Sequence, residues 1–217
     1  RRVLFRSKSS SGSGAPQQAR QHRRIGIFGG TFDPPHVGHL AAAVNVRHAL
    51  DLDVVLLVVA GQPWQKEGMR CISPAADRLA MVEAAVAGLE GLIASSIEID
   101  RGGPSYTIDT VRAILESEPD AEVFVIVGAD AAAGITTWER YRELVACSRM
   151  VVVGRPGARP TLPPVTDWVL VDVPAMDTSS TEVRARVADG RPLDVLLTPA
   201  VIDVVRQRGL YVAGANC

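Results

Sequence analysis

Apolar runs and amphipathic stretches alternate along most of the chain, and their order predicts its secondary structure. Five short apolar runs lack polar alternation, which favours strands that are buried on both faces of a sheet. They cover residues 25–28, 53–60, 122–127, 149–153 and 168–173. A further, weaker strand is expected near Ile97-Glu-Ile99. Helices are expected in the segments between, beginning near Gly38, at Ser73-Pro74, near Ser105 and after Trp138.

The alternation of strands and helices predicts one α/β domain built on a doubly wound parallel sheet, because parallel strands need helical crossovers. Two helices are expected to close this domain. The first follows Ser179-Ser-Thr-Glu182, which has the form of a capping box, and ends near Gly190. The second begins at Thr198-Pro199 and ends near Gly209. We expect the domain to cover residues 23–217.

Residues 1–22 differ in composition from the domain that follows them. The first six are three arginines and three apolar residues, and residues 7–14 are rich in Ser and Gly, as in a flexible linker. We expect this segment to be a disordered tail or an expression remnant that contributes no site. A functional basic arm is the alternative.

The overall charge and the cysteines exclude several classes of protein. A formal net charge of −1 over 217 residues argues against nucleic-acid binding by broad electrostatic attraction. No apolar stretch approaches the roughly 20 residues of a membrane helix. The three cysteines (Cys71, Cys147 and Cys217) are far apart and odd in number, which disfavours a disulfide framework and a zinc site. We therefore expect a soluble cytoplasmic protein with reduced thiols and no metal site of its own.

The segment between the first strand and the first helix carries the strongest chemical signal. A glycine-rich turn at Gly29-Gly30-Thr31 lets backbone N–H groups approach a phosphate, and the following helix N-terminus adds a positive dipole. His36 and His39 are three residues apart, so both rings can face one bound group from the first helical turn. An imidazole pair beside an oligophosphate can donate hydrogen bonds to oxygens whose charge grows during group transfer.

Residues of distinctive chemistry follow three of the predicted strands. The glycine turn and the two histidines follow the first strand, Lys66 follows the second, and Gly128-Ala-Asp130 follows the strand at 122–127. The carboxyl ends of parallel strands meet at one edge of a sheet, where ligands of open α/β folds bind. The sequence therefore predicts a single phosphate-binding site at this edge.

The string Gly29-Gly-Thr-Phe-Asp-Pro-Pro-His-Val-Gly-His39 resembles the HxGH signature of the nucleotidylyltransferase superfamily, and in particular its nicotinate mononucleotide adenylyltransferase branch. A second string, Ser179-Ser-Thr-Glu-Val-Arg184, is similar to the S-S-T-x-x-R signature of that branch. The resemblance extends from Arg23 to Val212. It implies a Rossmann-like nucleotidylyltransferase fold with C-terminal helices.

The resemblance also implies which residues contact the substrates. The catalytic positions correspond to His36, His39 and Lys66. ATP is implied to contact Gly29, Gly30, Thr31, Phe32, His36, His39, Gly128, Asp130, Ser179, Ser180, Thr181 and Arg184. Nicotinate mononucleotide is implied to contact Lys66, Tyr106, Thr107, Asp109 and Trp138. In this arrangement Trp138 stacks on the pyridine ring and Thr107 lies close to it.

Several of these residues have structural alternatives. Ser105 and Asp130 are also suited to cap helices, and Lys66 and Arg184 to be solvated charges. Trp138 has polar neighbours on both sides, which disfavours a core position. The chain departs from the family pattern in two places. Gln62-Pro-Trp-Gln65 stands where relatives commonly carry Asn-Pro-Pro-His, and Thr178 stands where they carry an aliphatic residue.

The implied reaction joins ATP and nicotinate mononucleotide into deamido-NAD and pyrophosphate, a step of NAD biosynthesis. A phosphate nucleophile is ionised at neutral pH, so the reaction needs positioning and charge stabilisation rather than a general base. Mg²⁺ is implied on the ATP phosphates. No basic residue in the matching segments around Thr107 and Trp138 is an obvious counter-ion, although Arg140 is nearby. We therefore expect backbone N–H groups near Thr107 and Trp138 to bind the nicotinate carboxylate.

Two other functions remain open. A phosphopantetheine adenylyltransferase would carry Thr at the position of His36 and would have a shorter chain. A catalytically idle nucleotide sensor would use the same pocket without turnover. The sequence leaves the oligomeric state open, a homo-oligomer included.

Overall fold

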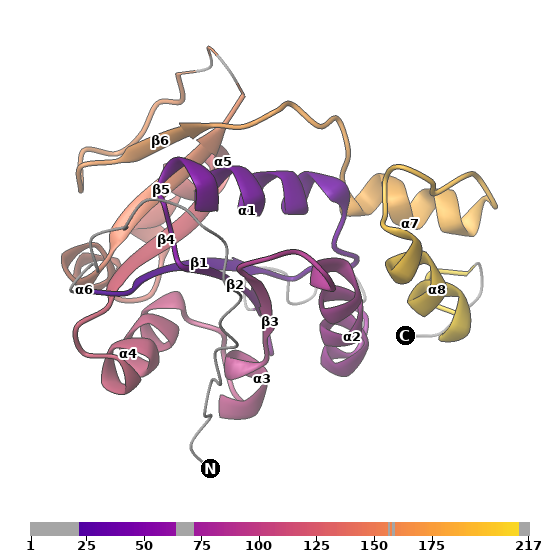
Figure 1. The fold of residues 1–217 in the computed structure, drawn as a ribbon, viewed down its shortest axis with the longest axis horizontal. Coiled ribbons are helices and arrows are strands. Elements are labelled where there is room, and N and C mark those ends of the chain that lie inside the picture. Colours follow the sequence, from indigo (N-terminus) through magenta and orange to yellow (C-terminus); the bar gives the residue numbers. More distant parts are fainter. Residues whose placement is uncertain (1–21, 64–71, 156, 158, 213–217) are drawn as a thin grey trace, which may run out of the picture.

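The computed structural model describes residues 22–63, 72–155, 157 and 159–212. Its centre is a sheet of six parallel strands in the order β3-β2-β1-β4-β5-β6 (Figure 1). The strands are β1 (Arg24–Gly30), β2 (Val54–Val59), β3 (Leu92–Ser95), β4 (Glu122–Gly128), β5 (Arg149–Gly154) and β6 (Val169–Asp172). The strand order reverses between β1 and β4, so their carboxyl ends form a topological switch point.

Helices connect the strands and extend the chain beyond the sheet. They are α1 (Val37–Ala49), α2 (Ala75–Val86), α3 (Ile97–Arg101), α4 (Thr107–Ser117), α5 (Ala129–Ala133), the 3₁₀ helix η2 (Ile135–Thr137), α6 (Tyr141–Cys147), α7 (Ser180–Ala188) and α8 (Pro199–Gln207). Figure 1 shows α7 and α8 together at one end of the molecule. None of the helices in the described residues is both long and apolar enough to cross a membrane.

The helices cover both faces of the sheet, as the unbroken apolar runs predict. In β2, Val55 and Leu57 pack into one core cluster with residues of α1, α2, α7 and α8. Val54 and Val58 point to the other face and pack into a second cluster with residues of α4, α5 and α6. Because alternate side chains of one strand are buried on opposite faces, the doubly wound parallel fold is confirmed.

The predicted strand near Ile97-Glu-Ile99 is wrong. β3 lies just before it and pairs with β2 from Leu92, while residues 97–101 form the short helix α3. Ile97 packs with the second core cluster and Ile99 with the first, so a helical turn buries both side chains. An alternation of three residues is too short to distinguish a strand from one helical turn.

The predicted helix caps are only partly confirmed. Ser179 accepts a hydrogen bond from the Glu182 N–H at 3.2 Å, but the Glu182 carboxylate bonds to Arg186 and Arg191 rather than returning to the cap. Thr198 caps α8 as expected, with its hydroxyl oxygen 3.4 Å from the Val201 nitrogen.

Two serines that precede helices do not cap them, and α5 and η2, like α3, were not among the expected helices. α2 begins after Pro74 with no side-chain cap, so Ser73 does not cap it. Tyr106 is the N-cap of α4, and the Ser105 hydroxyl instead accepts from the Gln62 N–H at 3.3 Å. The small helix α5 was not predicted, because three successive alanines carry no amphipathic pattern.

Candidate active site

The predicted glycine-rich turn lies between β1 and α1 and holds two histidines against each other. His36 is the N-cap of α1 and His39 lies one turn further on, with ring centroids 3.8 Å apart and planes tilted by 31°. The His36 N–H donates to His39 Nδ1 at 3.1 Å. A neutral His39 ring therefore carries its hydrogen on Nε2. The rings therefore lie together at the start of α1, and that both face one bound group stays a prediction.

Close packing around these rings leaves no room for a side chain at two glycine positions. A Cβ at Gly38 would lie 3.0 Å from His36 Nδ1, and a Cβ at Gly30 would lie 2.9 Å from the Phe32 ring. Phe32 has a φ of +50 and is 2% exposed, and its ring meets His39 edge-on with centroids 5.1 Å apart. The Phe32 side chain thus belongs to the core beneath the histidines and is not an exposed contact for ATP.

His36 is neutral at physiological pH. Burial lowers the pKa of its imidazole from 6.5 to about 4. Its Nδ1 atom is buried and has no hydrogen-bond partner among the described residues. A neutral imidazole donates through one nitrogen only, so His36 offers a hydrogen bond rather than a full positive charge.

The lowered pKa of His36 predicts a pH-dependent stability. Between pH 6.5 and about 4 the unfolded chain binds a proton at this residue and the native chain does not. Stability should therefore fall as the pH falls, by about 2 kcal/mol between pH 7 and pH 5 from this group. Urea unfolding at both pH values should show this loss, and His36→Asn should remove it. His48→Asn, in the same helix, is the matched control and should keep the loss. Equal pH dependence in the parent and His36→Asn would contradict the assignment.

Helix α7 reaches back to the same turn, so the two sequence motifs are in contact. Arg184 Nη1 donates to the Asp33 carbonyl at 2.7 Å, and the Ser180 hydroxyl donates to the Pro34 carbonyl at 2.8 Å. Arg184 Nη2 also donates to the Thr181 hydroxyl at 3.0 Å. Ser180 and Arg184 therefore support the turn that carries the histidines.

The turn is also held by the last described segment of the chain. Asp33 is 1% exposed, and the Tyr211 hydroxyl donates to its Oδ1 at 2.7 Å. Burial raises the pKa of Tyr211, and the neighbouring Asp33 carboxylate adds to this effect. The sequence offered no sign of this contact, because the two residues are 178 positions apart.

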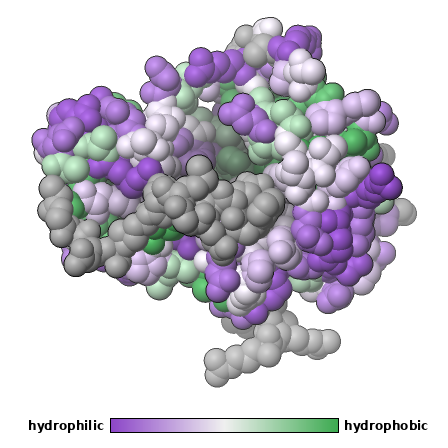
Figure 2. All heavy atoms as spheres, turned by 180° about the vertical axis from the view of Figure 1, so that it is seen from behind, coloured by the Kyte–Doolittle hydropathy of each residue, from purple (hydrophilic) through white to green (hydrophobic). Residues whose placement is uncertain are grey.

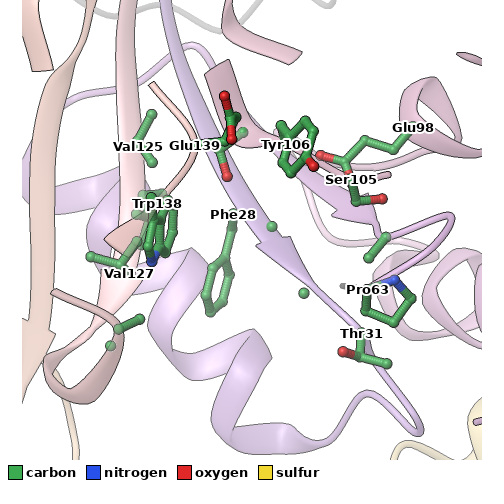
Figure 3. Close-up of a pocket in the computed structure, with 17 residues that line it drawn as sticks. Phe28, Thr31, Pro63, Glu98, Ser105, Tyr106, Val125, Val127, Trp138 and Glu139 are labelled. Atoms are coloured by element: carbon green, nitrogen blue, oxygen red, sulfur yellow. The ribbon is translucent and has the colours of Figure 1, made fainter. Parts of the chain in front are cut away.

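A pocket of about 250 Å³ opens beside the turn at the carboxyl ends of β1 and β4. Its lining residues are Phe28, Gly29, Gly30, Thr31, Ala60, Pro63, Glu98, Ser105, Tyr106, Thr107, Val125, Ile126, Val127, Gly128, Ala131, Trp138 and Glu139. In Figure 3, Trp138 and Val127 lie at one end of the pocket and Thr31 and Pro63 at the other. Figure 2 shows the molecule from behind the view of Figure 1. This face has a hollow with apolar side chains at its bottom.

Two backbone donors in this pocket are available to a ligand. The N–H groups of Thr107 and Glu139 donate to no acceptor within the described residues. Thr107 is the first residue of α4, where backbone N–H groups lack intrahelical partners. The Trp138 N–H is not available, because it donates to the Ile135 carbonyl at 3.0 Å. The expected donors near Thr107 and Trp138 are therefore Thr107 itself and Glu139.

Asp109 does not line the pocket, although the family resemblance implied a mononucleotide contact there. Its carboxylate forms an ion pair with Arg140. The hydrogen bond within this ion pair raises the pKa of the Arg140 guanidinium. Asp109 thus occupies the guanidinium of Arg140, and neither residue lines the pocket.

The remaining predicted residues fall into three groups. Gly29, Gly30, Thr31 and Gly128 line the pocket beside Tyr106, Thr107 and Trp138. Asp130 is exposed in the first turn of α5, outside the pocket lining. Lys66 lies outside the described residues. The sequence did not indicate three further lining residues, Phe28, Glu98 and Glu139. They lie on separate elements, and only the folded chain brings them to one pocket.

Comparison with known proteins places this site in a family. A model of cytidylyltransferase-like proteins matches residues 27–186. A probable nicotinate-nucleotide adenylyltransferase of Corynebacterium kroppenstedtii is 44% identical over 199 residues, covering 90% of this chain and 94% of that protein. A protein of the same name from Mycolicibacterium vanbaalenii is 41% identical over 201 residues, covering 88% and 94%.

A solved structure supports the fold. The chain superposes on Plasmodium falciparum nicotinic acid mononucleotide adenylyltransferase complexed with NaAD, with a TM-score of 0.72 and 17% sequence identity. The match covers 88% of this chain and 98% of that one. At this level of identity, the likeness shows a shared fold.

Proposed function

We propose that this chain, which belongs to the cytidylyltransferase-like family and within it to the nicotinate-nucleotide adenylyltransferases, transfers the adenylyl group of ATP to nicotinate mononucleotide. The products are deamido-NAD and pyrophosphate. The phosphate oxygen of the mononucleotide forms a bond to the α-phosphorus of ATP, and the bond from that phosphorus to the bridging oxygen of pyrophosphate breaks.

One observation carries this proposal. A pocket with an aromatic wall is lined by Gly29, Gly30 and Thr31, the start of the turn that leads to His36 and His39, although the two histidines are not among its lining residues. The aromatic wall suits a flat pyridine ring, and the glycine turn suits the phosphate attached to the same mononucleotide. The two parts of one substrate therefore match two adjoining parts of the site.

The histidine pair would stabilise charge on the phosphate oxygens. His39 Nδ1 accepts the His36 N–H, so a neutral His39 ring carries its hydrogen on Nε2, the nitrogen that would donate to a phosphate oxygen. Fixed donors need no reorganisation when charge develops, which makes them effective in group transfer. Because the attacking phosphate is already ionised, the residues position the two substrates and remove no proton.

The nicotinate group would be recognised without a charged partner from the protein. Trp138 would stack on the ring, and the N–H groups of Thr107 and Glu139 would donate to the carboxylate. Arg140 is already paired with Asp109, which supports recognition by backbone donors. Donors that meet a carboxylate form charge-assisted hydrogen bonds, which are roughly twice as strong as neutral ones.

Mg²⁺ would enter with ATP, bound to its β- and γ-phosphates, and would offset the charge of the departing pyrophosphate. Within the described residues, no group of three or more His, Cys, Asp or Glu side chains converges. Lys66 and Arg184 remain proposed phosphate partners, Lys66 from the family motif and Arg184 from its place beside the histidine turn.

The proposed function predicts equal formation of two products. Purified protein incubated with ATP, Mg²⁺ and nicotinate mononucleotide should release pyrophosphate and deamido-NAD in a 1:1 ratio, measured by chromatography. Replacing the mononucleotide with phosphopantetheine should give no pyrophosphate above the ATP-only control. Turnover with phosphopantetheine would favour the competing adenylyltransferase. Saturable binding of ATP without turnover would favour the idle sensor.

A further inference from the structure

Arg78 is a buried arginine that the reaction described above does not use. It lies in the first turns of α2 and is 2% exposed. Arginine side chains are almost never fully buried unless their donors are paired. The fork of the guanidinium carries five N–H donors in a fixed plane, so its partners must be arranged around it.

Four backbone carbonyls from three separate segments accept hydrogen bonds from Arg78. Nη1 donates to Thr31 at 3.0 Å and to Ala60 at 2.7 Å. Nη2 donates to Gly61 at 3.3 Å, and Nε donates to Ser73 at 2.9 Å. One side chain thus joins the turn after β1, the loop after β2 and the segment before α2.

Two of these four carbonyls belong to residues in the wall of the substrate pocket. Thr31 and Ala60 both line it. Gly61 packs tightly on the next wall residue, since a Cβ on it would lie 2.9 Å from the Glu98 carbonyl oxygen. The position of the Arg78 guanidinium therefore sets the separation of the β1 and β2 loops along this wall.

The same wall has further backbone links that depend on this separation. The Ala60 N–H donates to the Gly30 carbonyl at 3.0 Å, and the Ser105 N–H donates to the Gln62 carbonyl at 3.1 Å. Releasing the carbonyls of Ala60 and Gly61 would loosen the segment that carries both links. The loss would be felt at the Thr31 and Pro63 end of the pocket, beside the glycine turn that is proposed to hold the phosphate of the mononucleotide.

We propose that Arg78 is a positioning residue that fixes the β1 and β2 loops as one rigid wall of the acceptor pocket. The inference rests on the proposed function, because it assigns that wall to the mononucleotide rather than to ATP. Arg78 acts through the backbone and touches no reacting atom.

Kinetic constants of three variants test this role, measured at a temperature where each is fully folded. Arg78→Met should raise KM for nicotinate mononucleotide at least ~10-fold, with KM for ATP changed less than threefold. Arg78→Lys, which keeps the charge but not the planar fork, should be intermediate. Arg24→Met removes a partly buried arginine that pairs with Glu122 at the amino end of β1, and it should keep the parent constants.

Chemical rescue keeps the test decisive if Arg78→Met does not fold. Methylguanidinium added to Arg78→Ala should restore acceptor binding, whereas methylammonium at the same concentration should not. An acceptor KM within twofold of the parent in folded Arg78→Met would overturn the proposal. So would equal kinetic losses in Arg24→Met, or equal rescue by both cations.

Hydrogen exchange separates this proposal from the proposed function. In Arg78→Met the Ala60 amide should exchange at least ~10-fold faster than in the parent, while Arg24→Met should leave it unchanged. This result is expected even if the parent does not turn over nicotinate mononucleotide. Unchanged exchange at Ala60 in Arg78→Met would show that the guanidinium does not hold the wall.

Discussion

Replacing His39 with alanine should lower kcat by roughly 10²-fold or more, the scale for losing one preorganised donor to a developing negative charge. His39 Nδ1 accepts the His36 N–H, and in the proposed mechanism the other ring nitrogen would donate to the phosphates. The measurement is kcat with both substrates saturating, together with a melting curve. His48→Ala, on the same helix, is the control and should retain the parent kcat.

A second variant separates catalysis from helix capping. Gln at the third helical position can accept the N-cap N–H, as in a capping box. His39→Gln should therefore be more stable than His39→Ala, yet kcat should stay low because the imidazole donor is absent. A kcat within a few-fold of the parent in both variants would contradict the role given to His39.

Nicotinate mononucleotide should be preferred over nicotinamide mononucleotide by at least ~10² in kcat/KM. Two charge-assisted hydrogen bonds from Thr107 and Glu139 are at stake, worth a few kcal/mol together. The amide presents one oxygen and an NH₂ group, and the NH₂ would oppose a backbone donor. Comparing the two acceptors at fixed ATP measures this ratio directly. Equal kcat/KM for both acceptors would show that the N–H groups do not distinguish the carboxylate from the amide.

The stacking role of Trp138 adds a separate expectation for the same pocket. Trp138→Ala should raise KM for the mononucleotide and leave KM for ATP nearly unchanged, because the residue lines the acceptor pocket. Trp138→Phe keeps an aromatic face and should lose less. A change mainly in KM for ATP would contradict the placement of Trp138 beside the mononucleotide.

The sheet and its functional edge follow from the sequence because their signals are local. A strand that is apolar throughout must be buried on both faces of the sheet. In β2 this is so, because Val55 and Val58 are buried in different core clusters. The spacing of His36 and His39 likewise predicts that their rings lie close together, since about one helical turn separates the two residues. Patterns of this kind depend on neighbours within a few residues.

The contacts that the sequence did not indicate join distant segments. Arg78 has the appearance of an ordinary helix-surface charge in the sequence, and only the convergence of three loops makes it buried. Asp109 matches a family motif, but Arg140 occupies its carboxylate from 31 positions away. Backbone donors were expected near Thr107 and Trp138, and the Trp138 N–H itself donates to the Ile135 carbonyl. No local pattern carries information on such partners.

The most direct test of adenylyl transfer at this site follows the phosphorus atoms of ATP. ATP labelled with ³²P at the α-position, incubated with the protein, Mg²⁺ and nicotinate mononucleotide, should transfer its label to deamido-NAD. ATP labelled at the γ-position should release all of its label in pyrophosphate, and His39→Ala should slow both transfers equally. Label from the α-position in free AMP, or from the γ-position in inorganic phosphate or in the dinucleotide, would contradict the account.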